Sequence, residues 1–379
     1  MSEYRYYEFQ TIDRRLTPAE MAKLRDVSTR ARITPTSFVN EYEWGDFRGD
    51  VDAWMEQYFD AFLYYVNWGP RVFKLRLSSR LLSIGAADMY CVGESASARE
   101  RKGNTILTFE GDAEDDTEWE DESDALAALI PIRAQLARGD LRALYIGWLL
   151  CVQRGEIEED AQEPPVPAGL GELDGSLERL VDFLRVDPDL VTAAAAASAP
   201  LVVQALSRHD IRKWIAAQQS GDKDDYLERF IAGEKPELAS ELQRRIVDQR
   251  AAPAVSRSQP RTAGALLRVA ADAAEERRRA EAARADAERK RREREAAFAR
   301  AAYLEKLARK QPAVWTEIEQ LIATKQSASY DRAVSLLVDL RDIAVARGHE
   351  STFLRQLSDL QMKHARKPSL LAKMQRAGI

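Results

Sequence analysis

The densest group of polar and aromatic side chains in this sequence is NEYEWGDFRGD, at residues 40–50. Its carboxylates Glu41, Asp46 and Asp50 could together bind a divalent cation, because hard cations take several oxygen ligands in proteins. A metal-dependent phosphodiesterase or nuclease could be built on such a cluster. The competing interpretation is structural, with Glu41 facing solvent on a strand and Asp50 capping a helix. The sequence favours the structural interpretation and leaves catalysis as an alternative.

Other familiar arrangements of catalytic residues are missing from the sequence. It contains no Walker A, HExxH, paired CxxC or GxSxG motif. Residues 207–210, SRHD, place Ser, His and Asp side by side, and direct neighbours cannot adopt triad geometry. Asp210 is instead expected to cap a helix. Because the three His and two Cys lie far apart, we predict no metal and no cofactor. The absence of catalytic motifs favours a binding protein and leaves an enzyme as an open alternative.

Cysteine usage and hydropathy indicate where the protein works. Cys91 and Cys151 lie in apolar contexts and are expected to be buried free thiols, which suits a reducing compartment. The sequence contains no basic segment followed by an apolar one, which is the pattern of a secretory signal. The most apolar stretch, residues 192–206, is too short to span a bilayer. We therefore expect a cytoplasmic protein with no membrane segment.

Charge is divided unevenly along the chain. From Arg250 onward there are 27 basic and 16 acidic residues, a net +11, whereas the preceding residues hold 29 basic and 46 acidic ones, a net −17. Such asymmetry predicts two electrostatically distinct parts that attract each other, or a polyanionic partner for the basic part. A nucleic-acid-associated protein is therefore an alternative to a protein adaptor.

The last nineteen residues, QMKHARKPSLLAKMQRAGI, contain five cations and no acid. These cations are candidate contacts for an acidic partner, with a solvated surface as the competing interpretation: Lys363, Arg366, Lys367, Lys373 and Arg376. Two tryptophans of the N-terminal part, Trp44 and Trp68, are further candidate partner contacts.

The elements that would position these residues begin with an α+β domain at residues 1–110. Aromatic and alternating segments predict the order β-α-β-α-β, followed by two more strands. The first helix has a strong start, because Thr17 can cap it, Pro18 fits its first turn and Glu20 completes a capping box. A ferredoxin-like or related sandwich is the best match, although element order alone leaves the strand pairing open.

The remaining chain is expected to be mainly helical. The predicted order is an acidic loop at 111–124, a helical domain at 125–250 with an acidic Pro/Gly-rich linker at 155–175, a linker at 251–261, a long charged helix at 262–310 and a small helical module at 311–379.

The long charged helix admits three interpretations. Leu266, Ala273, Ala280 and Ala287 repeat every seven residues, as in a coiled coil, but an alanine seam buries little apolar area. Ion pairs at i,i+4 favour a single solvated helix, about 70 Å long at 1.5 Å per residue. Interleaved acids make a phosphate-binding arm the weaker alternative.

Two segments resemble known bacterial proteins. YDRAVSLLVDLRDIAVARG with FLRQLSDLQMKHARKPSLLAKMQRAGI resembles the helical C-terminal tail of SWIM zinc-finger proteins, over about the last 65 residues. This resemblance implies a helical interaction module without the zinc site, whose clustered Cys and His are absent. The opening YYEF strand and TPTSFVNEYEWGDFRGD resemble an uncharacterised bacterial family, which implies a genomic companion of SWIM zinc-finger proteins.

Together these observations predict a non-catalytic scaffold or adaptor that brings protein partners together, with a SWIM-type zinc-finger protein as one candidate partner. The alternatives are a nucleic-acid-associated protein that uses its basic half, and a metal-dependent phosphodiesterase.

Overall fold

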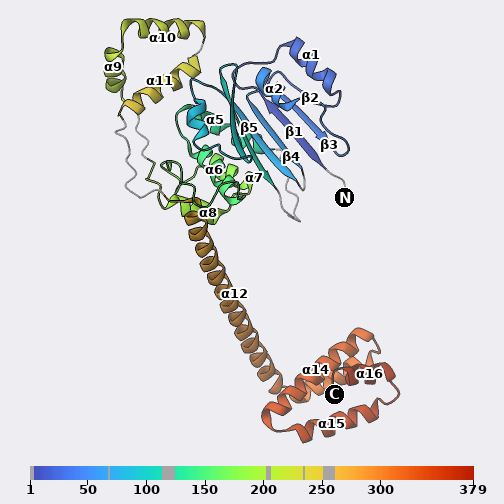
Figure 1. The fold of residues 1–379 in the computed structure, drawn as a ribbon. Coiled ribbons are helices and arrows are strands. Elements are labelled where there is room, and N and C mark those ends of the chain that lie inside the picture. Colours follow the sequence, from blue (N-terminus) through green and yellow to red (C-terminus); the bar gives the residue numbers. More distant parts are fainter. Residues whose placement is uncertain (1–3, 67–68, 113–123, 202–205, 234, 251–260) are drawn as a thin grey trace. The chain divides into compact units, whose positions relative to one another are not determined.

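The structure is a computed structural model that describes residues 4–66, 69–112, 124–201, 206–233, 235–250 and 261–379 (Figure 1). It divides into two compact units, Met1–Arg277 (unit 1) and Arg278–Ile379 (unit 2). Trp68, most of the acidic loop and most of the predicted linker at 251–261 lie outside the described residues.

Unit 1 is built on one seven-stranded antiparallel sheet with the order β2-β3-β1-β4-β5-β7-β6. Its strands are β1 (Arg5–Gln10), β2 (Arg32–Ile33), β3 (Ser37–Tyr42), β4 (Ala61–Val66), β5 (Pro70–Ser78), β6 (Ala96–Arg101) and β7 (Asn104–Asp112). The sheet with its helices confirms the predicted α+β class. The narrower expectation of a ferredoxin-like sandwich is not confirmed by this strand order.

One face of the sheet is packed against α1 (Pro18–Val27) and α2 (Val51–Gln57). Its core is aromatic, with Phe9 and Phe38 packed around Trp54 of α2 at ring-centroid distances of 5.2 and 4.9 Å. The predicted capping box of α1 is present, since Thr17 and Glu20 each accept a hydrogen bond from the other's backbone N–H. A short helix, α3 (Ile84–Asp88), follows β5.

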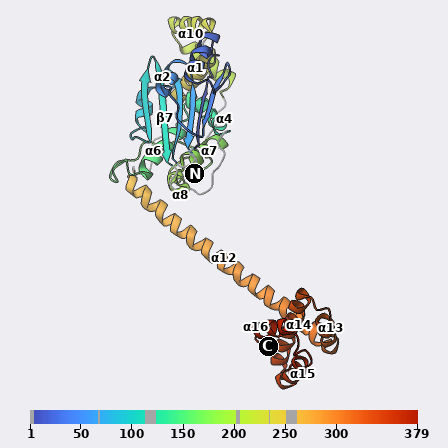
Figure 2. The same cartoon turned by 90° about the vertical axis from the view of Figure 1, so that its right-hand side faces the viewer.

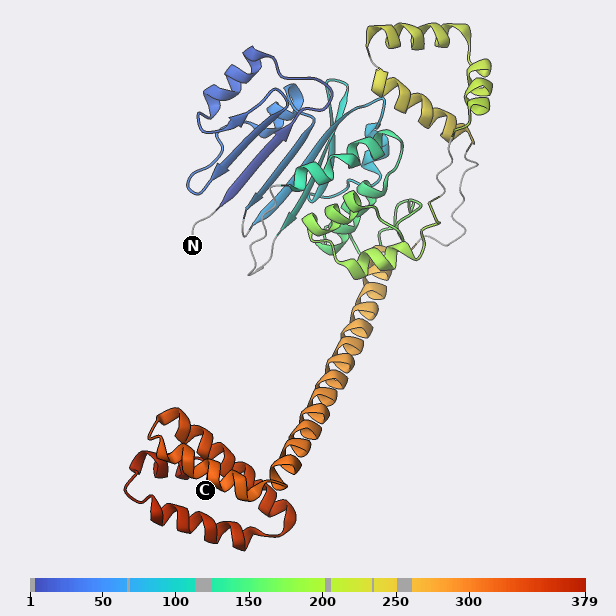
Figure 3. The same ribbon diagram turned by 180° about the vertical axis from the view of Figure 1, so that it is seen from behind.

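The opposite face is covered by helices from the next part of the chain, which Figure 3 shows in front of the sheet. They are α4 (Ala125–Leu129), α5 (Pro131–Ala137), α6 (Arg142–Gln153), α7 (Gly175–Leu184) and α8 (Pro188–Ala195). Eleven of the twelve residues of α6 are buried, as expected for a helix that is apolar on all sides. The predicted α+β and helical segments therefore share one hydrophobic core.

The acidic segment at 155–175, expected as a linker, packs within unit 1 and contacts the residues at the start of the long charged helix. Glu163 accepts hydrogen bonds from the Tyr145 hydroxyl and from Arg261, whose Nε lies 2.8 Å away. Gln162 forms a β-bridge with Thr262, and the backbone N–H of Gly264 donates to Glu159 at 2.9 Å. These contacts attach the start of the long charged helix to unit 1.

Three further helices of unit 1, α9 (Arg208–Ala217), α10 (Ser220–Ala232) and α11 (Lys235–Arg250), form a group beside the sheet (Figure 1). The expectation that Asp210 caps α9 is wrong by three residues. Ser207 is the cap, and Asp210 is its capping-box partner in the first turn. A serine three residues before an acid satisfies two backbone donors instead of one, which explains the preference.

The long charged helix, predicted at 262–310, is α12 (Ala263–Ala308), a single uninterrupted helix (Figure 2). Its buried residues are confined to the first turns, between Ala263 and Ala270. Beyond them most side chains are exposed, and several are paired along the helix, including the expected pairs of Asp286 with Lys290 at 2.7 Å and Glu288 with Arg292 at 2.6 Å.

Unit 2 has its own hydrophobic core, formed by α13 (Gln311–Ala323), α14 (Ser327–Arg347), α15 (Glu350–Lys363) and α16 (Pro368–Arg376). The last turns of α12 belong to it. Arg300 pairs with Asp342 at 2.9 Å, and the Tyr303 hydroxyl donates to Asp339 at 3.0 Å.

A buried ion pair joins several elements of unit 1. Asp60 is fully buried and pairs with Arg76 at 2.6 Å. The same carboxylate accepts hydrogen bonds from the backbone N–H groups of Ile12 and Asp13 at 2.6 and 3.0 Å. Arg76 also donates to the carbonyl of Met55 at 3.1 Å, so the pair connects β1, α2, β4 and β5.

We expect Asp60→Asn to lower the free energy of unfolding by about 3 kcal/mol, because it leaves the Arg76 charge buried without its counterion. Chemical denaturation of the full chain measures this loss. The control Asp26→Asn, at an exposed position of α1, should change stability by less than about 0.5 kcal/mol. Equal effects of the two substitutions would show that the buried pair does not stabilise unit 1.

Candidate functional site

The three candidate catalytic carboxylates share no partner in unit 1. Asp46 accepts a hydrogen bond from the Tyr7 hydroxyl at 2.6 Å and pairs with Arg5 at 2.7 Å. Asp50 caps α2 through the N–H of Ala53 at 3.0 Å, as the structural interpretation expects. Glu41 is exposed on β3. Among the residues that the structure describes, no group of three His, Cys, Asp or Glu could hold a metal ion.

The loop around these carboxylates is held by aromatic packing. Phe47 packs on Tyr7 and Trp54, at centroid distances of 5.2 and 4.9 Å. Its ring lies so close to Gly49 that a Cβ atom there would come within 2.3 Å of it. Trp44, a candidate partner contact, is 79% exposed and is available for an interaction. Position 49 is a glycine because a larger side chain there would collide with the Phe47 ring, so no catalytic role is needed to explain it.

We expect Gly49→Ala to destabilise unit 1 by about 1–3 kcal/mol, because the new methyl group must displace the Phe47 ring. Gly85→Ala is the matched control, since no atom lies within 4 Å of its added Cβ and the position is helical. The control should be neutral or slightly stabilising. Thermal unfolding of both variants measures the difference, and a neutral Gly49→Ala would contradict the packing argument.

A charge cluster that sequence reasoning missed lies beside α2. Asp52 pairs with Lys74 of β5 at 2.8 Å and with Arg99 of β6 at 2.6 Å. The hydrogen bonds from Arg99 and Lys74 lower the pKa of Asp52 from 3.8 to about 2, against burial, which raises it. The pairing joins strands and helix that are distant in sequence, so its role is to hold α2 on the sheet.

A carboxyl whose pKa is lowered by folding stabilises the folded state above its unfolded pKa, and this contribution disappears as the pH falls towards the folded pKa. For Asp52 that window runs from about 3.8 down to about 2. We expect Arg99→Gln to raise the Asp52 pKa towards 3.8. A carbon-detected NMR titration measures it. Arg101→Gln is the control, because Arg101 pairs with Glu56 instead; an unchanged Asp52 pKa in Arg99→Gln would contradict the assignment.

Both cysteines are free, and their thiols are expected to be unreactive at neutral pH. Cys151 is buried and Cys91 is half-buried. Burial raises the pKa of each thiol to about 12, so neither is a thiolate at neutral pH. The expectation of buried free thiols is confirmed for Cys151, whereas Cys91 is free but only half-buried.

Three of the five basic candidates in unit 2 are used inside the unit. Lys363 pairs with Glu319 at 2.7 Å, Lys367 donates to the Ile322 carbonyl at 2.8 Å, and Lys373 contacts Asp331. These cations join α15 and α16 to α13 and α14. Arg366 and Arg376 are exposed, and no hydrogen bond or ion pair is found for either among the described residues.

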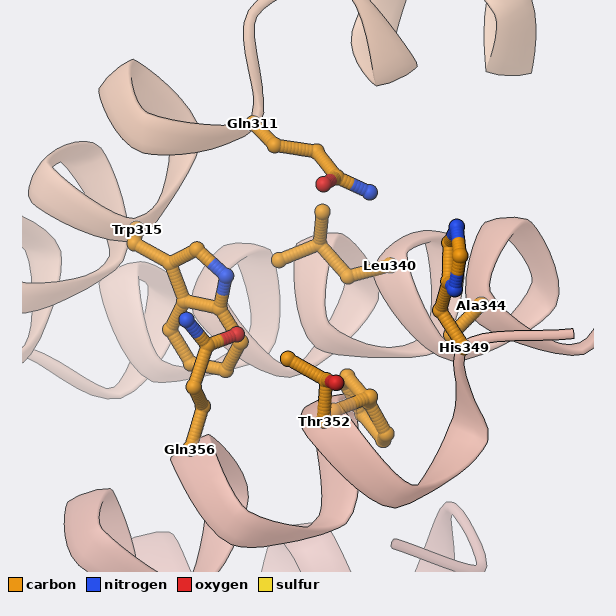
Figure 4. Close-up of a pocket in the computed structure, with 8 residues that line it drawn as sticks. Gln311, Trp315, Leu340, Ala344, His349, Thr352 and Gln356 are labelled. Carbon is orange, nitrogen blue, oxygen red and sulfur yellow. The ribbon is translucent and has the colours of Figure 1, made fainter. Parts of the chain in front are cut away.

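Unit 2 also contains a pocket that the sequence did not predict, at the meeting point of α13, α14 and α15 (Figure 4). Its apolar lining includes the buried side chains of Leu340, Ala344 and Phe353. Trp315 lies against Phe353 with a centroid distance of 6.1 Å. Figure 4 shows the rings of Trp315 and His349 on opposite sides of the pocket.

The rim of this pocket is polar and open to solvent. The side chains of Gln311, His349, Thr352 and Gln356 surround the opening. Gln and Thr side chains offer both donors and acceptors, and can therefore bind the backbone of a peptide. The pocket encloses about 40 Å³. Since a single water needs about 10–15 Å³ by the same measure, this is room for about three waters or one aliphatic side chain.

The pocket escaped sequence reasoning because its residues come from three helices and span positions 311 to 356. The available signal was Trp315, a large aromatic residue on a short amphipathic helix. Its position at an opening, rather than in a closed core, depends on how α13 crosses α14 and α15.

No protein-family model, curated protein or solved structure matches this chain. Within the described ranges, no helix combines the length and the apolar composition needed to cross a bilayer.

Proposed function

We propose that this protein is a non-catalytic adaptor whose C-terminal module, residues 311–379, docks a protein partner. The observation that carries the proposal is the open pocket with Trp315 at its side and Leu340 and Phe353 in its lining. Aromatic and aliphatic side chains around a surface hollow are typical of places where a partner's side chain anchors at a protein interface.

The size of the pocket favours a protein partner over a small-molecule substrate or cofactor. Sites for such ligands usually enclose about 300–1,000 Å³, far more than the 40 Å³ found here. A single aliphatic side chain inserted from a partner suits the volume, and the polar rim suits the adjoining peptide backbone. Protein interfaces often rely on a few anchors of this kind.

The ion pairs along α12 argue against the nucleic-acid alternative. Many of its exposed cations are paired with acids one turn away, including Arg289 with Asp286 and Arg291 with Glu295. Phosphate-binding surfaces instead present cations without competing carboxylates. The expectations of a SWIM-type zinc-finger partner, a cytoplasmic location and a ferredoxin-like or related fold remain proposals that rest on the resemblance and the residue patterns.

Affinity purification of the tagged full chain from its host tests the proposal, with the variant Thr352→Arg and its control Ser351→Arg. Thr352 lines the pocket, whereas Ser351, its exposed neighbour in the same turn of α15, does not. We expect Thr352→Arg to fill the opening and to reduce recovery of a stoichiometric protein partner at least tenfold, while Ser351→Arg retains it.

Recovery is compared with and without nuclease treatment. A partner that survives nuclease and is lost only in Thr352→Arg supports the adaptor. Co-purifying nucleic acid, with all protein partners lost on digestion, would replace the proposal with the nucleic-acid alternative.

A further inference from the structure

We infer that the pocket of unit 2 binds a short acidic segment of a partner protein. An aliphatic side chain of about Val or Leu size would enter the pocket, and neighbouring carboxylates would pair with cations around the rim. The inference rests on the proposed docking function and specifies the chemistry of the partner.

The first support is the uneven use of charge within the module. Residues 311–379 contain ten Lys or Arg and seven Asp or Glu. Five of these acids are already in ion pairs: Glu317, Glu319, Asp331, Asp339 and Asp342. For several cations, no hydrogen bond or ion pair is found among the described residues: Lys325, Arg347, Arg355, Arg366 and Arg376. The uncompensated charge of the module is therefore positive.

The second support is the position of these cations. Arg347 lies two residues before His349, and Arg355 directly precedes Gln356; both His349 and Gln356 line the pocket. Lys310, whose side chain also has no ion pair among the described residues, directly precedes Gln311 of the rim. All three cations are exposed. Two acids adjoin lining residues, Asp339 before Leu340 and Glu350 after His349, and Asp339 is already paired with Arg300.

The third support is the combination of positive charge with a pocket whose walls include apolar side chains. Cations alone would attract any polyanion, including a nucleic acid, but a phosphate backbone has no side chain for a pocket lined by Leu340 and Phe353. A second copy of this module would bring the same positive charge to the surface and be repelled. An acidic peptide with an aliphatic anchor satisfies both features, and the amide groups of Gln311 and Gln356 can bind its backbone.

Selection from a random 12-residue peptide library displayed on phage, with the immobilised full chain as target, tests the inference. We expect the enriched peptides to share one Val, Leu or Ile beside two or more Asp or Glu. Enrichment of these peptides should disappear with Thr352→Arg and persist with Ser351→Arg. The double variant Arg347→Glu/Arg355→Glu should instead select peptides with Lys or Arg beside the aliphatic residue.

Anisotropy measurements with one enriched, fluorescein-labelled peptide then give the magnitudes. Replacing its aliphatic residue with Ala should weaken binding about tenfold or more, because a buried aliphatic side chain contributes about 1.5–3 kcal/mol. Replacing each acid with its amide should weaken binding about two- to fivefold, as expected for exposed ion pairs, and raised salt should reduce this difference.

The outcomes separate the inference from the proposed function. Enriched peptides that depend on Thr352 but carry no acids, or an unchanged preference in Arg347→Glu/Arg355→Glu, overturn the acidic partner and leave docking in place. The absence of any enrichment, or equal enrichment with Thr352→Arg, overturns both. Thermal unfolding of each variant tests whether the module is folded. If Thr352→Arg does not fold, the charge preference of the exposed double variant Arg347→Glu/Arg355→Glu alone decides whether the partner is acidic.

Discussion

Unit 1 is organised by one constraint, which is that its sheet carries large apolar side chains on both faces. Because alternate residues of a strand point to opposite faces, each face needs its own cover. Helices α1 and α2 cover one face around Phe9 and Trp54, and α4 to α8 cover the other. Beside α2 the strands carry Lys74 and Arg99, which pair with Asp52. The buried Asp60–Arg76 pair connects α2 to the strands β1, β4 and β5.

Unit 2 contains cations that are paired within the fold and cations for which no pairing is found among the described residues. Lys363, Lys367 and Lys373 hold its helices together through contacts with Glu319, Ile322 and Asp331. A cation that is paired within the fold offers less to a partner, because its charge is already compensated. The cations left uncompensated near the pocket, Arg347 and Arg355, lie outside the segment whose composition is most basic. Composition therefore indicated the excess of cations in this segment but not which of them are paired within the fold.

The long helix α12 is stabilised differently at its ends and in its middle. At its start, backbone hydrogen bonds from Ala263 and Gly264 attach it to the acidic segment at 155–175 of unit 1. At its end, Arg300 and Tyr303 contact α14 within unit 2. Between these ends, helix propensity and ion pairs one turn apart stabilise the helix, and each such pair contributes only about 0.2–0.5 kcal/mol.

The sequence alone determined the features that depend on neighbours a few residues apart. The capping box at Thr17, the cap at Asp50 and the extent of the charged helix were predicted because such contacts arise within one or two helical turns. Tertiary structure alone decided the strand order, the pairing of Lys363 with Glu319 and the pocket beside Trp315. These features depend on contacts between different elements, such as that of Lys363 with Glu319, which are 44 positions apart. Local patterns do not encode which elements pack together.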